Sequence, residues 1–303
     1  MRAAAHALAA LADTPFPAER CADPTPVLEL DHGRHLLVTE YVEPTPPPSR
    51  AFVGAWCAAL LGRLAGGRLL TTAAATWTVL GARSLRSEGR AVHDHLAAGD
   101  LAAAREQVTH LVGRDPSVLD EDGVARAALE SVAENTCDAI VAPLFWGAIA
   151  GVPGLLAYRA ANTLDAMVGH RSPRYADFGW AAARLDDAAN LVPARLTAAL
   201  VAVAAPAVGA DGLAALRTAR RDGRRHPSPN SGFSEAAYAG AIGLRLGGRN
   251  VYAGRVEERP VLGDGRTPEV EDLLRATRLC AAVTVAAGVA AGVAALAPRR
   301  GCR

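Results

Sequence analysis

The sequence contains no lysine, so all 32 of its basic residues are arginines. A Walker A phosphate-binding loop, a Schiff-base enzyme and a Ser–Lys hydrolase each need a lysine side chain, and the composition excludes all three. If this protein handles phosphate, it must use arginine, backbone N–H groups or a metal ion.

Cysteine and aromatic residues are also scarce. The five cysteines include no C-x-x-C pair, so the sequence shows no pattern of a zinc knuckle or of a disulfide framework. We therefore expect reduced thiols. Aromatic residues make up only 5% of a chain that is 50% hydrophobic, so alanine, leucine and valine supply most of the apolar mass. The 31 acidic residues nearly balance the basic ones and leave a net charge of +1. Such a chain lacks the large excess of positive charge that attracts nucleic acids, so a nucleic-acid partner is not expected.

Residues 1–50 differ in character from the remainder of the chain. The segment 27–42 predicts a short hairpin-like structure around a glycine turn, and a proline-rich stretch from Pro44 to Pro48 predicts a stiff linker. An alanine-rich start reaches Asp13 quickly and has no clear cleavage site, so we expect no signal peptide. We therefore divide the chain into a divergent N-terminal segment (1–50) and a helical domain (51–303).

Four apolar stretches follow the linker, at residues 52–82, 139–158, 196–210 and 279–298. The second and the fourth are uncharged for about 20 residues, roughly the length of a membrane span. Alanine contributes little to membrane insertion, so an alanine-rich soluble bundle is the alternative. We expect an all-α, multi-pass helical membrane protein with polar helical loops.

Polar helices are expected between the apolar stretches. One helix should cover 120–136, and another should cover 181–191 and end near Pro193. A third is expected at 234–246, and the segment 252–267 after it is rich in turn residues.

The pattern N-T-x-D-A-x-V occurs twice, in residues 133–141 and again in residues 160–168. In each copy an asparagine and an aspartate lie three residues apart, on one face of a helix. Glycines and prolines between the copies disfavour one straight span, so we expect a kinked or re-entrant hairpin that puts both copies on the same side. The plainer alternative is that these residues only cap helix ends.

Three further polar clusters surround this repeat. Arg184, Asp186, Asp187 and Asn190 form a pattern suited to Mg²⁺, which takes one or two carboxylates together with substrate phosphates. Arg171 and Arg174 flank a turn and could bind phosphate with two hydrogen bonds each. The loop with Ser228 and Asn230 precedes a helix start, where N–H groups and the helix dipole favour an anion. Each cluster alone is also explained by an ordinary solvated surface or a helix cap.

Taken in order, these motifs resemble the adenosylcobinamide-phosphate synthase family (CobD/CbiB) of cobalamin biosynthesis. The resemblance extends from about residue 69 to the C-terminus. It is carried by LVGRD (111–115), ESVAENT (130–136), APLFW (142–146), YRAANTLDAM (158–167), FGW (178–180), ARLDD (183–187), PARLT (193–197), HPSPN (226–230) and LGG (246–248). The N-terminus departs from the family, because the His-Pro-Val segment expected after Asp23-Pro24 is missing.

The resemblance implies a multi-pass protein of the cell membrane that acts late in corrinoid assembly, with its active site on the cytoplasmic side. The family joins a propionate carboxylate of adenosylcobyric acid to aminopropanol or its O-phosphate, and ATP is expected to drive this amide formation. Expected partners are therefore the corrinoid, the amine and the lipid bilayer. A homo-oligomer, or contact with other corrinoid-pathway enzymes, is also compatible with the resemblance.

Chemical reasoning then assigns roles to the candidate residues. Mg²⁺ would bind carboxylates from the set Asp138, Asp165, Asp186 and Asp187. The catalytic set is Glu134, as the base for the incoming ammonium, with Asp165 and Arg184. Substrate and phosphate groups would be held by Asn135, Asn162, Arg171, Arg174, Ser228 and Asn230.

Two other functions are open. A non-catalytic membrane modulator, similar to the distantly related AmpE proteins, would not need the repeated Asn/Asp pairs. A membrane transferase that uses a prenyl diphosphate would bind a lipid diphosphate and would not use ATP. The pair Asp186–Asp187 resembles the Asp-rich motif of such enzymes, but it lacks the third carboxylate and a matching second motif.

Overall fold

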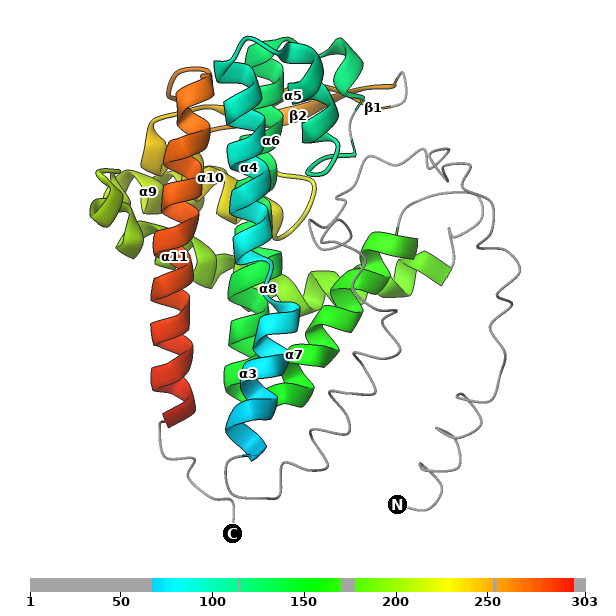
Figure 1. Ribbon diagram of the computed structural model, residues 1–303, viewed down its shortest axis with the longest axis vertical. Helices are drawn as coiled ribbons and strands as arrows, with labels where there is room; N and C mark the ends of the chain where they lie inside the picture. Colours follow the sequence, from blue (N-terminus) through cyan, green and yellow to red (C-terminus); the bar gives the residue numbers. More distant parts are fainter. Residues whose placement is uncertain (1–66, 114, 170–177, 253–254, 297–303) are drawn as a thin grey trace. The chain divides into compact units, whose positions relative to one another are not determined.

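The computed structural model describes residues 67–113, 115–169, 178–252 and 255–296, and this part of the chain is mainly helical (Figure 1). The expected all-α fold is therefore confirmed. The N-terminal hairpin-like segment, the boundary at residue 50, and both Arg171 and Arg174 lie outside the described residues.

Most of the described residues lie in α-helices. The α-helices are α3 (Gly67–Val79), α4 (Ala82–Ala97), α5 (Leu101–Val108), α6 (Glu121–Thr136), α7 (Ala142–Val168), α8 (Phe178–Ala204), α9 (Gly212–Asp222), α10 (Ser231–Ile242) and α11 (Val270–Leu296). Shorter helical turns are η2 (Pro116–Val118), η3 (Cys137–Val141) and η4 (Ala205–Val208).

Helix α6 is the central element of the core. Asp120 caps its N-terminus by accepting a 2.8 Å hydrogen bond from the N–H of Gly123. From Val124 onward every side chain except that of Arg126 is buried, because α4, α10 and α11 all pack against this helix (Figure 1). Alanine and other small residues on α6 allow this close approach from several sides.

Helix α6 continues through the wide π-helical turn η3 into α7, and α7 is not straight. Gly151 has φ 68° and ψ −156°, a conformation that is essentially restricted to glycine. A Cβ atom at Gly154 would lie 2.5 Å from the carbonyl oxygen of Trp146, eight residues earlier. Eight residues of straight helix would span about 12 Å, so the chain reverses at Gly151 and α7 is a helical hairpin.

Helix α8 extends beyond its predicted end. We expected a helix over 181–191 that ends near Pro193, but α8 continues through this proline to Ala204. Proline has no N–H for the carbonyl of Ala189, four residues earlier. The indole Nε1 of Trp146 donates to that carbonyl at 3.1 Å instead. The prediction was wrong because a side chain from α7 supplies the missing donor.

A two-stranded sheet replaces the predicted turns after α10. Helix α10 ends at Ile242 rather than at 246, and Gly243, which has φ 76°, caps it. Strands β1 (Leu246–Tyr252) and β2 (Arg255–Leu262) then pair antiparallel. Glu130 on α6 accepts a 2.7 Å hydrogen bond from the N–H of Gly247, which attaches the sheet to the core. The sequence argument took the glycines as turn signals and missed Val251, Val256 and Val261, whose β-branched side chains favour strands.

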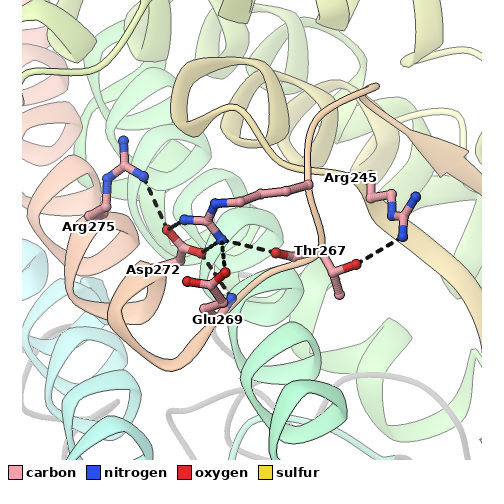
Figure 2. A network of polar contacts seen from close by, with 6 residues as sticks. Arg245, Thr267, Glu269, Asp272 and Arg275 are labelled. Carbon is pink, nitrogen blue, oxygen red and sulfur yellow. Dashed lines mark hydrogen bonds and ion pairs between the residues drawn. The ribbon is translucent and has the colours of Figure 1, made fainter.

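A network of arginines fixes the start of α11, as Figure 2 shows. The carboxylate of Asp272 is fully buried and accepts two hydrogen bonds from Arg266, at 2.7 and 2.9 Å. Arg275 and the N–H of Glu269 donate to the same carboxylate, at 3.1 and 2.9 Å. This buried charge is therefore paired and fully bonded, as burial of a carboxylate requires.

Three helical segments among the described residues are long and apolar enough to cross a membrane. They are Glu121–Val168, Gly179–Val208 and Val270–Ala295. Several large apolar side chains on α3 and α11 face outward, namely Leu69, Leu70, Trp77, Val285, Val289 and Val293. These surfaces match a lipid environment and indicate a membrane protein.

Candidate functional site

Carboxylates from three parts of the sequence converge. Asp138, in the turn η3, interacts electrostatically with the carboxylates of Asp186, Glu134 and Asp165. Asp186 in turn interacts with its neighbour Asp187. The predicted acidic residues of α6, α7 and α8 therefore surround one region, which we call the acidic site.

The hairpin in α7 brings the two copies of the repeated motif to this site. The hydroxyl of Tyr158, after the turn, donates to Oδ1 of Asn190 at 2.9 Å. The thiol of Cys137, before the turn, lies 3.9 Å from the same oxygen. Residues on both sides of Gly151 thus meet the same side chain of α8, and the predicted hairpin is confirmed.

The carboxylate of Asp186 is held on both of its oxygens. Nδ2 of Asn162 donates to Oδ1 at 3.0 Å, and Nδ2 of Asn190 donates to Oδ2 at 3.1 Å. Both asparagines are buried. A carboxylate bound in this way by two fixed amides has little freedom to rotate.

The two copies of the motif use their asparagines differently. Asn135, in the first copy, donates along its own helix to the backbone carbonyl of Ser131 at 3.0 Å. Asn162, in the second copy, donates across to Asp186. Helix capping alone explains neither contact, because neither side chain bonds the free N–H groups at a helix start.

Glu134 meets the N-terminus of α10. The hydroxyl of Ser231 donates to Oε1 of Glu134 at 2.6 Å, and the Glu134 side chain is buried. The positive end of the α10 dipole favours a negative charge at this place. The loop expected to cradle an anion therefore lies beside a carboxylate of the protein itself.

The same loop is joined to α8 by two contacts. Nδ2 of Asn230 donates to the backbone carbonyl of Asp187 at 2.8 Å, while Arg195 donates to Oδ1 of Asn230 at 3.3 Å. Within the loop, Oγ of Ser228 accepts from the N–H groups of Asn230 and Ser231, at 3.3 and 3.2 Å. These bonds fix the loop against the acidic site.

Arg184 is an exposed residue beside Asp187 of the acidic site. Its side chain is 67% exposed, and Nη1 is 4.0 Å from Oδ2 of Asp187. Its guanidinium also lies 5.9 Å from the centre of the Trp180 ring. A long ion pair at an exposed position contributes little to stability, so this arginine can turn toward another anion.

In the part of the chain that the structure describes, no group of three or more His, Cys, Asp or Glu residues could hold a metal ion. The acidic site offers several carboxylates and two amides that bond Asp186, not a complete protein cage. Asn162 and Asn190 present their N–H groups to Asp186, and the Oδ1 atom of Asn190 accepts from Tyr158.

Sequence reasoning missed three residues of this site. Tyr158, Arg195 and Ser231 all make contacts to the predicted residues. Tyr158 and Arg195 are both inside motif blocks that carried the family resemblance, YRAANTLDAM and PARLT. Tyr158 is uncharged, and Arg195 is the single charged residue of its block, so neither belonged to a polar cluster. Their positions inside these blocks were the signal that could have identified them. Ser231 directly follows the block HPSPN, and its position at a helix start was the available signal.

Comparison with known proteins is consistent with these motifs. Residues 49–280 match the family model described as CobD/Cbib protein. The cobalamin biosynthesis protein CobD of Mycobacterium tuberculosis is 55% identical over 235 residues, which cover 77% of this chain and 75% of that protein. The protein of the same name from Rhodobacter capsulatus is 51% identical over 219 residues, covering 72% of this chain and 67% of the relative. No solved structure matches this chain.

Proposed function

Because this chain belongs to the CobD/CbiB family of cobalamin biosynthesis proteins, we propose that it is the ligase that attaches an amino alcohol to a corrinoid. The corrinoid substrate is adenosylcobyric acid, and the amine is aminopropanol or its O-phosphate. An amide forms between the amine and a propionate carboxylate, at the expense of ATP. The convergence of Glu134, Asp138, Asp165 and Asp186 is the observation that carries this proposal.

The reaction needs activation of the carboxylate, because hydroxide is a poor leaving group. A propionate oxygen attacks the γ-phosphorus of ATP, ADP leaves, and an acyl phosphate forms. The amine nitrogen then attacks the acyl carbon, and inorganic phosphate leaves with the electrons of the broken C–O bond. The protein has to position these groups and compensate the developing charges.

Glu134 is the proposed base that accepts a proton from the incoming ammonium. It is buried, and Ser231 orients it with a hydrogen bond of 2.6 Å. A base must lie within hydrogen-bond reach of the proton that it accepts, and a fixed carboxylate meets this condition best. Asp165, which interacts with Asp138, completes the catalytic acids.

Arginines take the place of the missing lysine at the phosphate groups. Arg184 is exposed and only loosely paired, so its guanidinium can bind phosphate oxygens in a bidentate manner. Arg171 and Arg174 are assigned the same role from their sequence position. Further substrate or phosphate contacts are proposed for Asn135, Asn162, Ser228 and Asn230.

The acidic site fits a magnesium ion that arrives with ATP. Mg²⁺ usually keeps several waters and is bound by one or two carboxylates together with the nucleotide phosphates. Asp138, Asp165, Asp186 and Asp187 would supply these carboxylates, and a cage of three or more protein ligands is not required. The ion would supply charge compensation at the phosphates.

The site is proposed to face the cytoplasm from the cell membrane. The segment between the candidate spans that end at Val208 and begin at Val270 carries exposed arginines, namely Arg217, Arg220, Arg221, Arg224 and Arg225. Excess positive charge beside a span favours the cytoplasmic side. Ser231, which contacts Glu134, belongs to the same segment.

The test is reconstitution of the reaction with purified full-length protein in detergent or nanodiscs. Adenosylcobyric acid, aminopropanol phosphate and Mg-ATP are supplied, and the amide product is followed by mass spectrometry together with release of ADP. Amide formation that requires ATP is the expected result. ATP-independent turnover of a prenyl diphosphate, or failure to convert any corrinoid, would contradict the proposal.

A further inference from the structure

We propose that Tyr158 and Asn190 are positioning residues that fix the Asp186 carboxylate for amide formation, an inference that rests on the proposed function. Neither residue touches a substrate in this scheme. Both act through Asp186, whose carboxylate belongs to the acidic site.

The evidence begins with the amide of Asn190, both ends of which are bonded. Its Nδ2 donates to Oδ2 of Asp186 at 3.1 Å, and its Oδ1 accepts from the hydroxyl of Tyr158 at 2.9 Å. The Asn190 residue is 1% exposed and Tyr158 is 3% exposed, so water does not replace these bonds. The tyrosine hydroxyl therefore decides which end of the amide faces Asp186.

The other oxygen of Asp186 is held by Asn162 at 3.0 Å. A carboxylate offers about four lone-pair sites, and two donors leave the remaining sites for a cation. The two amides thus set the plane of Asp186 and the direction of its remaining lone pairs. Asp186 interacts electrostatically with Asp187 and Glu134, so the direction of its remaining lone pairs would affect how a cation binds among these carboxylates.

Loss of the tyrosine hydroxyl has a specific physical effect. Without this hydroxyl, Oδ1 keeps only the weak thiol donor of Cys137 at 3.9 Å, and the Asn190 amide can turn by about half a revolution, since the two orientations of an amide differ little in shape. Its oxygen would then face an oxygen of Asp186, and the two would repel each other. Asp186 would lose one donor and its fixed plane.

The structure offers a matched control in Trp146. Its Nε1 donates a hydrogen bond of 3.1 Å to the carbonyl of Ala189, the residue before Asn190. This bond also joins α7 to α8. This bond compensates Pro193 and does not involve a carboxylate. Tyr158→Phe and Trp146→Phe each remove one hydrogen bond between α7 and α8, so a purely structural role predicts equal effects on turnover.

The experiment compares both variants with the wild type as full-length proteins in nanodiscs. For Tyr158→Phe, kcat should fall by about 10- to 100-fold, the usual cost of removing a group that orients a ligating residue. The KM for the corrinoid should stay close to that of the wild type. Trp146→Phe should keep its kcat, while its unfolding temperature falls at least as far as that of Tyr158→Phe.

A second measurement does not depend on turnover. Binding of Mn²⁺ in the presence of ATP is followed by electron paramagnetic resonance, and Tyr158→Phe should bind about 10-fold or more weakly, whereas Trp146→Phe should bind as the wild type does. The double variant Tyr158→Phe/Asn190→Ala should lose no more than Asn190→Ala alone, because the two residues act in series.

Equal kcat and equal Mn²⁺ affinity of Tyr158→Phe and wild type would overturn the inference, and so would an equal loss in Trp146→Phe. If the wild type makes no amide, the proposed function fails, and the Mn²⁺ measurement alone decides the positioning role. A wild-type protein that neither makes amide nor binds Mn²⁺ would overturn both.

Discussion

The hydroxyl of Ser231 lies 2.6 Å from Oε1 of Glu134, although the two residues are 97 positions apart in the sequence. This hydrogen bond connects the first turn of α10 to the end of α6. It joins the motif ESVAENT to the residue that directly follows the motif HPSPN, and the two motifs are far apart in the chain. In the proposed reaction it orients the carboxylate that accepts the ammonium proton.

Replacement of Ser231 by alanine should therefore reduce turnover. A hydrogen bond to a charged group is worth about 1.5–3 kcal/mol, so kcat should fall about tenfold or more. The control is Ser234→Ala. It removes a hydroxyl that donates a hydrogen bond of 2.9 Å to the Ser231 carbonyl within the same helix. Steady-state kinetics on both proteins decides the matter. If the two variants lose activity equally, the contact to Glu134 has no special role.

Asp165→Asn should abolish product formation without unfolding the protein. The substitution keeps the shape of the side chain but removes its negative charge from the acidic site, where Asp165 interacts with Asp138. We expect a loss of at least about 100-fold in kcat, equivalent to about 2.7 kcal/mol of transition-state stabilisation. Product is quantified by mass spectrometry, and circular dichroism monitors folding.

The matched control for this variant is Asp211→Asn. Asp211 caps α9 by accepting a 2.9 Å bond from the N–H of Ala214, and asparagine caps a helix about as well. This second Asp→Asn change should leave activity intact. Near-normal turnover of Asp165→Asn would remove Asp165 from the proposed scheme.

Gly151→Ala should disturb the hairpin of α7. The φ of 68° and ψ of −156° at this residue are accessible to glycine and costly for alanine, by about 1–3 kcal/mol. We expect lower thermal stability and lower activity, because both copies of the repeated motif depend on this turn. Gly288→Ala, on an open helical surface of α11 with no atom near its Cβ position, should be neutral or slightly stabilising. Equal melting temperatures for the two variants would show that the turn does not require glycine.

Asp222 predicts a dependence of stability on pH. Hydrogen bonds from the Arg221 guanidinium, at 2.8 and 3.0 Å, hold the pKa of this buried carboxyl below its ordinary value. The folded pKa is lower than the unfolded pKa, near 3.9, so the stabilisation is present above about pH 5 and is lost as the pH falls through the folded value. Asp222→Asn should therefore destabilise the protein by about 2 kcal/mol at pH 7, and the difference should shrink below pH 4.

Asp264 provides the control for that experiment. It pairs with the same Arg221 at 2.8 Å, but its side chain is 80% exposed. Exposed ion pairs contribute little to the free energy of unfolding. Asp264→Asn should therefore hardly change the unfolding midpoint, both at pH 7 and below pH 4. Denaturant unfolding in detergent across this pH range measures both effects. A constant difference between wild type and Asp222→Asn at all pH values would contradict the assignment.

The sequence was sufficient to predict the helical class, the hairpin between the motif copies and the grouping of the acids. These features depend on local patterns: apolar length, the glycines and prolines between the copies, and an asparagine and an aspartate spaced by three residues in each copy. Asp138, Asp165, Asp186 and Asp187 could be placed in one set of candidate Mg²⁺ ligands in advance, because carboxylates near amides suit this cation.

Other features depended on contacts between distant residues, and local patterns could not reveal them. The extension of α8 through Pro193 depends on the indole of Trp146, 47 positions earlier along the chain. The pairing of β1 with β2 depends partly on Glu130 and Arg126 of α6, which bond Gly247 at its N–H and carbonyl. The different orientations of Asn135 and Asn162 likewise follow from their neighbours in space, since their local sequences are nearly the same.

The π-helical turn η3 has a consequence for how this protein tolerates insertions and deletions. Such a turn contains one residue more than an ordinary helical turn. Removal of one residue between Cys137 and Val141 would convert this turn into an ordinary α-helical turn and leave the residues after it near their present rotation about the axis. Removal of one residue from the regular helix of α6 would instead rotate everything that follows by about 100°, and Tyr158 and Asn162 would point away from their partners on α8. The turn η3 is thus the place where this segment can lose one residue and keep the rotational phase of its second arm.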